Sequence, residues 1–477
     1  MCNKSLPDAM SPLSGWHEAD ANRLTQVNPP WVPAVHNASV SIDEPSPEEV
    51  NPHYLDHVIH TSESRAVEAS EDIVSQNGIK LLAKGAQINA KVRDRLLMHK
   101  LQKPLEDCIQ VTDGVMPESF GPLGEALFEQ HPLLKAICAH DLYASAPATL
   151  ASLKLSGPVQ SLLTVYAEHQ GDRLKHTAGV AMLALALARR MPPGETEQHR
   201  TLALAGLLHD VGELYIDPQY MRPGTPLGPA QWRHVASHPV VGERVLRNMP
   251  GAGKAVASAV LHHHERLDGF GYPRGVQGAA LPLAGQILAA AEWLMALIET
   301  SMTPLTRASV ATKLIPGEFS RELTEAIAAA AQASLPPTAA VADPMPLESA
   351  IPRVIGIAAT LERFRNTRPW IEQQIAAARP ALRAVLDAGL QRLLRIQTAF
   401  SSTGLDAHDP DALVAVLSEQ RDAALQVELM TVVGELEWRM RELERESLLR
   451  AGLLPTSESD VIRELVARLQ GQAPTDD

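Results

Sequence analysis

The sequence is poor in cysteine and in basic residues. Its three cysteines, Cys2, Cys108 and Cys138, show no short pairing pattern, so a disulfide framework and a cysteine-based metal site are both disfavoured. The 42 basic residues are outnumbered by 56 acidic ones, which gives a net charge of −14. Because general nucleic-acid binders are usually basic, we expect no DNA partner. A small anionic substrate needs only a local positive site, such as a metal ion.

Long apolar runs are also missing. The longest uninterrupted run of small and apolar residues is Ala178 to Ala188, or 11 residues, whereas a membrane helix needs roughly 18 or more. The N-terminus lacks the basic-then-apolar pattern of a signal peptide. We therefore expect a cytoplasmic protein with no membrane partner.

The chain has 477 residues, 45% of them apolar and only 4% aromatic. This length predicts two or three domains, and the abundance of alanine and leucine favours helices. The pattern along the chain predicts a disordered tail over 1–52, a small α+β domain over 53–155, a helical domain over 156–332, a proline-rich linker over 333–353 and a C-terminal helical region over 354–477.

Local patterns refine these regions. Gly78 to Gly85 has strand-like residues between two glycines, which predicts a short hairpin. In the helical domain we expect helices over Asp172–Arg190, Leu202–Leu208, Pro239–Met249, Ala252–His264 and Leu283–Ile298.

The C-terminal region reads as long helices over Ile371–Phe400 and Asp411–Arg450. In the second, leucine, valine and methionine recur from Leu425 to Leu443 at spacings of three and four. Two uses of this seam stay open: packing within the chain, or a homodimer through the C-terminal helices.

Histidines and carboxylates gather in the helical domain. Asp172 and His176 are four residues apart, so they share one helical face. His209 and Asp210 end an apolar helix, and His238 opens a His-Pro-Val-Val-Gly stretch. Imidazole and carboxylate suit iron, manganese, cobalt, nickel or zinc. An adjacent His-Asp pair can serve two metals when the Asp bridges them, and two metals clamp a phosphoryl group and activate water.

Two motifs carry a resemblance to a known family. Leu207 to Gly212, Leu-Leu-His-Asp-Val-Gly, resembles the HD motif of the HD phosphohydrolases. His263 to Pro273, His-His-Glu-Arg-Leu-Asp-Gly-Phe-Gly-Tyr-Pro, resembles the motif of the HD-GYP branch. The resemblance covers about residues 160 to 310. It implies an all-helical HD-type metal-binding bundle, flanked here by the small α+β domain and the C-terminal helices.

Family members hydrolyse cyclic dimeric GMP with two or three divalent metal ions, often iron or manganese. Carried over, the resemblance makes His262 an extra, non-ligating histidine, while Tyr272 either supports the loop or contacts guanine. Gly269 and Gly271 should supply unusual backbone angles. Glu292 stands where the family has an aspartate ligand, and Asp172 where members with a third metal have a glutamate. The implied metal ligands are Asp172, His176, His209, Asp210, His238, His263, His264 and Glu292.

The sequence departs from the family pattern near the expected substrate phosphate. Glu213 replaces the usual lysine and would repel phosphate unless a metal or an arginine neutralises it; alternatively, it serves as a ligand or base. Gln286 replaces an arginine, and Thr303 to Arg307 keeps only the proline and one arginine of an Arg-Pro-Tyr-Arg stretch.

The sequence thus predicts a metal-dependent phosphodiesterase of cyclic dimeric GMP. His209, Asp210 and Glu213 are the expected catalytic residues, and Tyr272 and Arg307 the expected substrate contacts. Two alternatives stay open: a catalytically weak metal-binding receptor or scaffold, and an HD hydrolase of another nucleotide.

Overall fold

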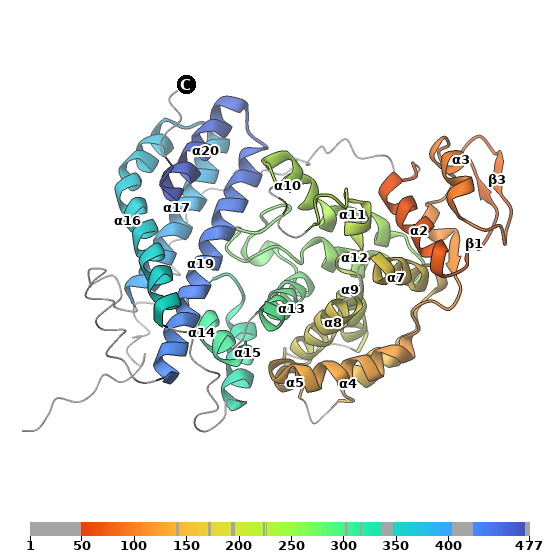
Figure 1. Ribbon diagram of the computed structural model, residues 1–477, viewed down its shortest axis with the longest axis horizontal. Helices are drawn as coiled ribbons and strands as arrows, with labels where there is room; N and C mark the ends of the chain where they lie inside the picture. The colour runs from red at the N-terminus through yellow and green to blue at the C-terminus, as the bar shows by residue number, and fades with distance from the viewer. Residues whose placement is uncertain are drawn as a thin grey trace, which may run out of the picture. The chain divides into compact units, whose positions relative to one another are not determined.

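The computed structural model describes residues 49–139, 143–169, 173–191, 196–222, 225, 227–300, 304–314, 317–334, 347–402 and 423–472. Over these residues the chain is mainly helical, and its short strands lie in the N-terminal part (Figure 1). The predicted fold class, a helical protein with a small N-terminal α+β part, is confirmed. The predicted disordered tail lies outside the described residues up to residue 48.

The N-terminal part contains two small antiparallel strand pairs. β1 (Val67–Ala69) pairs with β4 (Ile109–Val111), with Val67 opposite Val111. β2 (Ile73–Val74) pairs with β3 (Lys80–Leu82). The predicted hairpin is therefore present, with its first strand just before Gly78. Gly78 and Gly85, on either side of β3, both have a φ of 78°, which glycine adopts without a steric penalty.

Short helices surround these strands. Asn51 caps the first of them, because its side chain accepts hydrogen bonds from the backbone N–H groups of His53 and Tyr54. The α-helices of this part are α2 (Pro52–Ser64), α3 (Arg93–Leu97), α4 (Phe120–Gln130), α5 (Pro132–Cys138) and α6 (Ala146–Ala151). Three 3-10 turns accompany them: η1 (Ala90–Val92), η2 (Leu105–Asp107) and η3 (Pro117–Ser119).

The helical domain is built around one buried helix. α8 (Arg173–Arg190) is buried continuously from Thr177 to Ala188, so the longest apolar run of the sequence forms the centre of this core. Gly206 lets α9 (Thr196–Leu208) approach α8 closely, because a Cβ there would lie 2.4 Å from the Cα of Ala181. The other elements are α7 (Gly157–His169), α9 (Thr196–Leu208), η4 (Val211–Tyr215), α10 (Pro229–Val235), α11 (His238–Arg247), α12 (Gly253–Leu261), η5 (Gly278–Ala280), α13 (Leu283–Thr300), α14 (Pro304–Leu314) and α15 (Arg321–Ala333).

One described helix, α13, is long and apolar enough in composition to cross a membrane. Its 18-residue window has a mean hydropathy of 1.3, but 61% of that window is buried inside the protein. α13 packs against α8 and α12 and also carries Glu292. It is a core helix of the domain.

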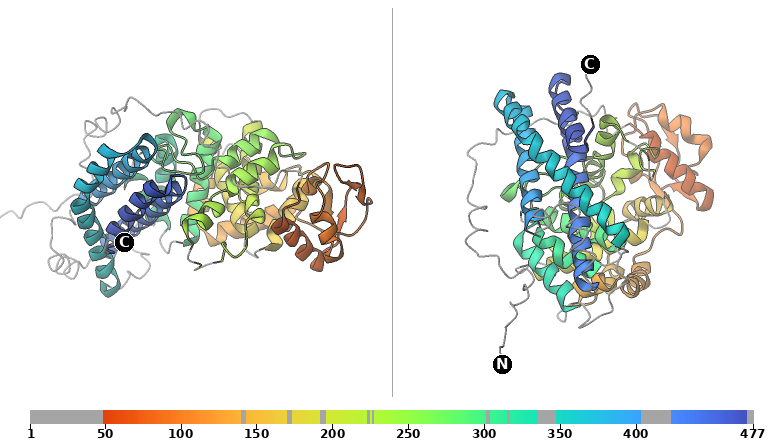
Figure 2. Two further views of the ribbon diagram at one scale, coloured as in Figure 1. Left: turned by 90° about the horizontal axis from the view of Figure 1, so that it is seen from above. Right: turned by 60° about the vertical axis from the view of Figure 1, so that its left-hand side comes forward.

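The C-terminal bundle, residues 347–402 and 423–472, has a hydrophobic core of its own. It consists of α16 (Leu347–Ala377), α17 (Pro380–Ser401), α19 (Ala423–Ala451) and α20 (Thr456–Gln470). α19 also contacts α10 and α14, and so lies on the side of the bundle that faces the helical domain (Figures 1 and 2). Part of the predicted seam is buried in this core, namely Val432, Leu436, Met440 and Leu443. These residues therefore pack within the chain, which was one of the two uses predicted for the seam.

Three of the differences from the sequence-based boundaries bear on the site and on the C-terminal bundle. α12 ends at Leu261 rather than His264, so the three histidines follow the helix instead of belonging to it. α16 begins at Leu347, and Pro352 lies inside that helix rather than in the expected linker. The helix expected over 371–400 is broken, because α16 ends at Ala377 and α17 starts at Pro380.

Candidate metal centre

Five helices of the domain bring the predicted ligands together. α8 carries His176, and α13 carries Glu292. His209 and Asp210 follow the end of α9, where the helix gives way to η4. His238 opens α11, and His263 and His264 follow α12. Because these elements pack on one core, ligands far apart in the sequence meet at one point.

The ligand atoms form two groups that could each hold a metal ion. The first group is Asp210, His238, His263 and His264, and the second is His176, His209 and Glu292. Within each group the ligand atoms all lie within 4.8 Å of one another. The structure thus brings together seven of the eight predicted ligands. The eighth, Asp172, lies outside the described residues.

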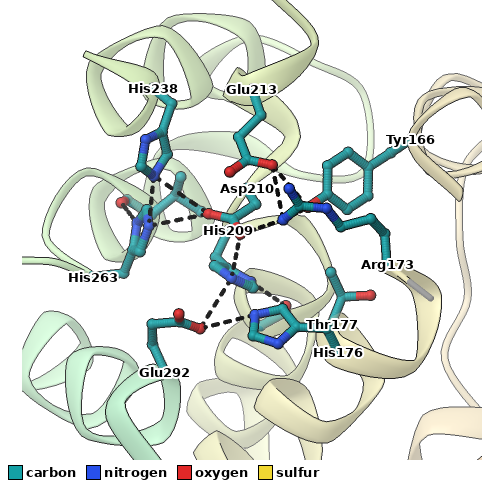
Figure 3. Close-up of polar contacts among 12 residues, drawn as sticks. Tyr166, Arg173, His176, Thr177, His209, Asp210, Glu213, His238, His263 and Glu292 are labelled. Atoms are coloured by element: carbon teal, nitrogen blue, oxygen red, sulfur yellow. Dashed lines mark hydrogen bonds and ion pairs between the residues drawn. The ribbon is translucent and has the colours of Figure 1, made fainter. Parts of the chain in front are cut away.

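Asp210 lies between the two groups (Figure 3). Its Oδ1 is 3.3 Å from Nε2 of His238 and 3.4 Å from Nε2 of His263. Its Oδ2 is 3.1 Å from Nε2 of His209, which belongs to the second group. One carboxylate therefore presents one oxygen to each group, which is the arrangement of a bridging ligand.

Hydrogen bonds fix the tautomers of three of these histidines. The Nδ1 atoms of His209, His238 and His263 lie 2.9, 2.9 and 2.6 Å from the backbone carbonyl oxygens of Gly206, Val235 and Val260. A carbonyl only accepts, so each Nδ1 must donate its proton. In the neutral ring each Nε2 then carries a lone pair, and all three lone pairs point toward Asp210.

This convergence fits a cation. Nε2 of His238 lies 3.1 Å from Nε2 of His263 in a buried site, so the two nitrogens either share a proton or, when both rings are neutral, turn two lone pairs toward each other. Burial lowers the pKa of His263 to about 4, which keeps this ring neutral at pH 7. Burial opposes ionisation of Asp210 as well, but the histidines around it hold its pKa well below the usual range. Burial disfavours the charged form of His209, but Asp210 and Glu292 raise its pKa to about 10, so without a metal this ring holds a proton. A divalent metal would displace that proton, and neutral imidazoles around an ionised carboxylate would then form its donor set.

His176 is oriented by a carboxylate that the sequence analysis missed. Its Nε2 lies 3.1 Å from Glu292, and its Nδ1 lies 3.0 Å from Glu299. A carboxylate on the outer nitrogen fixes the ring of a metal-ligating histidine and raises its basicity. Glu299 is seven residues after Glu292 on α13, or two helical turns, and this spacing was the available signal.

Glu213, which replaces the family's lysine, has an arginine partner. Its Oε2 lies 3.0 Å from Nη1 of Arg173 and 3.4 Å from the hydroxyl of Tyr166 (Figure 3). Burial raises the pKa of Glu213 to about 7, and the charge of Asp210 adds to the shift. Arg173 was not predicted from the sequence, although it stands three residues before His176 on the same side of α8. This arginine offsets the carboxylate, as the sequence argument required.

The GYP loop, residues 268–276, folds back onto the histidines. The Glu265 carboxylate accepts hydrogen bonds from the backbone N–H groups of Arg274 at 2.7 Å and Val276 at 3.0 Å. Gly269 has a φ of 74°, as expected. Gly271 is needed for a different reason than predicted: a Cβ there would lie 2.4 Å from the carbonyl oxygen of His264.

Of the remaining predicted residues, Tyr272 contacts a candidate ligand, whereas His262, Gln286 and Arg307 contact residues outside the two ligand groups. The Tyr272 ring stacks on His264 with 4.6 Å between ring centroids. His262 belongs to neither ligand group, and its Nδ1 contacts the carbonyl oxygen of Ser258. The Gln286 side chain donates to the carbonyl oxygen of Leu281. Arg307 contacts Glu435 of α19 and Thr300, so its described contacts are away from the ligand groups.

The comparisons with known proteins agree with this geometry. Residues 160–316 match the family model described as HD domain. This part of the chain is similar to the HD domain family, and its Gly-Tyr-Pro loop resembles that of the HD-GYP branch.

Among curated relatives, a 3'3'-cGAMP-specific phosphodiesterase of Vibrio cholerae is 34% identical over 26% of this chain and 28% of its own length. A cyclic di-GMP phosphodiesterase of Pseudomonas aeruginosa is 36% identical over 24% of this chain and 27% of its own. A cyclic di-GMP phosphodiesterase of Thermotoga maritima is 31% identical over 35% of this chain and 46% of its own. The chain spans less than half the length of each of these relatives.

Proposed function

We propose that the chain is a metal-dependent phosphodiesterase that hydrolyses cyclic dimeric GMP. The observation that carries this proposal is the carboxylate of Asp210, which presents one oxygen to His238 and His263 and the other to His209. Two divalent ions, iron or manganese, would be held by the two ligand groups. Asp172 remains a predicted ligand of a third ion.

The two ligand groups fit phosphodiester chemistry. A pair of metal ions polarises a phosphoryl oxygen and activates water for in-line attack. The residues of the chain hold the ligands in fixed orientations, because three imidazoles are bonded to backbone carbonyls and His176 is bonded to Glu299. Such preorganisation is most of what a protein contributes at a metal centre.

The choice of substrate is a proposal supported by relatives. Two of the relatives above are named for cyclic di-GMP and one for 3'3'-cGAMP. 3'3'-cGAMP is therefore the second candidate substrate. Both are bacterial signalling nucleotides, and we keep the cytoplasm as the expected location.

The Arg173–Glu213 pair bears on whether turnover is efficient. A lone carboxylate at position 213 would repel a phosphate, which was the argument for a catalytically weak receptor. Arg173 lies 3.0 Å from Glu213 and 3.8 Å from Asp210. Its charge supports the enzyme over the receptor, because the pair presents little net charge to the substrate.

The test is a turnover assay on protein purified anaerobically and loaded with iron or manganese. Cyclic dimeric GMP and 3'3'-cGAMP are incubated separately, and the products are separated by chromatography. We expect hydrolysis of cyclic dimeric GMP by the wild type and none by the His209→Ala, Asp210→Ala double variant. Metal-loaded wild type that binds both nucleotides without hydrolysing either would contradict the proposal and favour the receptor. Hydrolysis of 3'3'-cGAMP alone would reassign the substrate.

A further inference from the structure

Phe270, in the middle of the GYP loop, is buried in the core of the C-terminal bundle. Its ring is 4% exposed and belongs to the same hydrophobic cluster as Leu393 of α17 and Leu436 of α19. It does not belong to the core built around α8. The loop is thus anchored to helices that follow the HD domain in the sequence.

Arg450, near the end of α19, holds the backbone on both sides of Phe270. Its Nη2 donates to the carbonyl oxygens of Gly269 at 2.5 Å and Gly271 at 3.4 Å. Its guanidinium also lies 5.0 Å from the centroid of the Phe270 ring, within cation–π range. One side chain of the bundle therefore contacts three consecutive loop residues.

Asp268, at the start of the loop, is held by α17. Its Oδ2 lies 3.1 Å from Arg392 and 3.2 Å from Arg395. Asp268 and Arg392 are 4% and 1% exposed, so this ion pair is shielded from water and little screened by salt. The other carboxylate oxygen accepts the backbone N–H of Phe270 at 3.0 Å. Both anchors fix the loop from the side of the bundle.

The opposite side of the loop meets a candidate metal ligand. Tyr272 stacks on the His264 ring with an interplanar angle of 25°, and its backbone N–H donates to the carbonyl oxygen of His264 at 3.2 Å. Only one residue, Gly271, separates Tyr272 from Phe270. A displacement of the Phe270 backbone should therefore also displace Tyr272 and, through it, the His264 ring.

We propose that the C-terminal bundle completes the metal centre, with Arg450 and Phe270 as positioning residues that hold Tyr272 against His264. The inference rests on the proposed function for its catalytic consequence, but not for its structural one. The bundle acts through the loop and need not touch the substrate. Loss of the contacts that Arg450 and Phe270 make should increase the mobility of the loop and displace Tyr272 and His264.

The test compares Arg450→Met with Arg353→Met. Arg353 is also half-buried in the bundle, but it pairs with Glu437 of α19 and so serves as a matched control. We expect Arg450→Met to speed hydrogen–deuterium exchange in residues 268–276 by at least about fivefold. We expect kcat to fall by about tenfold to a hundredfold, because small misplacements in an active site cost this much. Arg353→Met should change neither, and Arg450→Lys, which keeps a donor, should recover part of both.

A second variant guards against simple unfolding. Phe270→Leu keeps an apolar side chain in the bundle core and should speed the same exchange, with the midpoint of thermal unfolding within a few degrees of wild type. Unchanged exchange in residues 268–276 in both variants would overturn the proposal, whether or not the protein hydrolyses a nucleotide. Faster exchange with unchanged kcat and KM in an active enzyme would overturn the catalytic part. An inactive wild type with faster loop exchange in the variants would contradict the proposed function alone.

Discussion

Among the described residues, two buried clusters of charged and histidine side chains are built in opposite ways. In the cluster between the HD domain and the C-terminal bundle, arginines neutralise carboxylates: Arg439 lies 3.0 Å from Glu318 and 2.5 Å from Glu435. At the candidate metal centre, imidazole Nε2 atoms face Asp210 and one another, 3.1 to 3.4 Å apart. In the first cluster arginines offset the carboxylates permanently, whereas in the second the histidines can exchange their protons for a metal ion.

This difference indicates whether a buried ionisable group serves the stability of the fold or the binding of a metal ion. A carboxylate with a guanidinium partner has its desolvation offset within the chain, and its removal should affect folding. A carboxylate surrounded by imidazoles is offset by protons on those rings or by a metal ion that displaces them, and its removal should affect metal content.

The largest expected effect on stability is at Arg439. Arg439→Met leaves Glu318 and Glu435 as buried carboxylates with one neutralising partner fewer, and should lower the free energy of unfolding by about 3 to 5 kcal/mol. Chemical denaturation followed by circular dichroism measures the change. Arg463→Met, which breaks an exposed pair with Asp460, is the control and should change it by less than about 0.5 kcal/mol. Equal changes in the two variants would show that the buried cluster carries no special weight.

The next effect concerns Glu213. Restoring the family's lysine by Glu213→Lys places a second cation beside Arg173, so we expect lower stability, by about 1 to 3 kcal/mol, and no gain in turnover. Denaturation and the turnover assay measure both. The exchange Arg173→Glu with Glu213→Lys should regain part of the lost stability, because it restores one charge of each sign. Faster turnover of the single variant would show that repulsion of phosphate by Glu213 dominates.

A smaller, pH-dependent effect is expected at Glu446. This residue is 1% exposed, and its Oε2 has no hydrogen-bond partner among the described residues. Burial raises its pKa from 4.5 to about 7. The folded protein holds this proton more tightly than the unfolded chain, so stability falls as pH rises from 4.5 through 7.

Glu446→Gln removes that loss. We expect it to be more stable than wild type at pH 8 by about 1 to 3 kcal/mol and nearly equal at pH 5. Denaturation at the two pH values gives both differences. An equal difference at pH 5 and pH 8 would show that the carboxyl does not titrate in this range.

The smallest expected effect separates a ligand from its neighbour. His262 belongs to neither ligand group, so His262→Gln should leave metal content unchanged. His264→Gln, two positions on, should reduce it. Elemental analysis of the two variants measures the contrast, and the reverse outcome would shift the assignment of the histidines by one residue or more.

Much of the site could be predicted from the sequence because its ligands lie in motifs with fixed local spacing. His209 and Asp210 are adjacent, and the histidines after α12 open an unbroken motif. Arg173 and Glu299 were missed, since a charged residue on a helix gains meaning only from the side chain that folding brings opposite it. Arg307 was expected near the substrate because it lies in a stretch that resembles a family motif. Its pairing with Glu435, 128 residues away, could not be predicted from the local sequence.

The helices of the fold were predictable from apolar periodicity, but their ends and partners less so. α12 ends before His262, and the backbone beyond it places His263 and His264 beside Asp210. The anchoring of Phe270 in the C-terminal bundle joins segments more than 100 residues apart. No local pattern encodes such a contact, because Phe270 follows a glycine in what reads as a surface turn.

The most direct test of the bridged two-metal centre is the metal content of the anaerobically purified protein. Wild type and Asp210→Asn are loaded with manganese, passed through the same desalting step and measured by elemental analysis against protein concentration. We predict at least two ions per chain in the wild type and a loss of at least one in Asp210→Asn, with the far-ultraviolet circular dichroism unchanged. A wild type that holds one ion or none, or a variant with the wild-type content, would contradict the bridging role of Asp210.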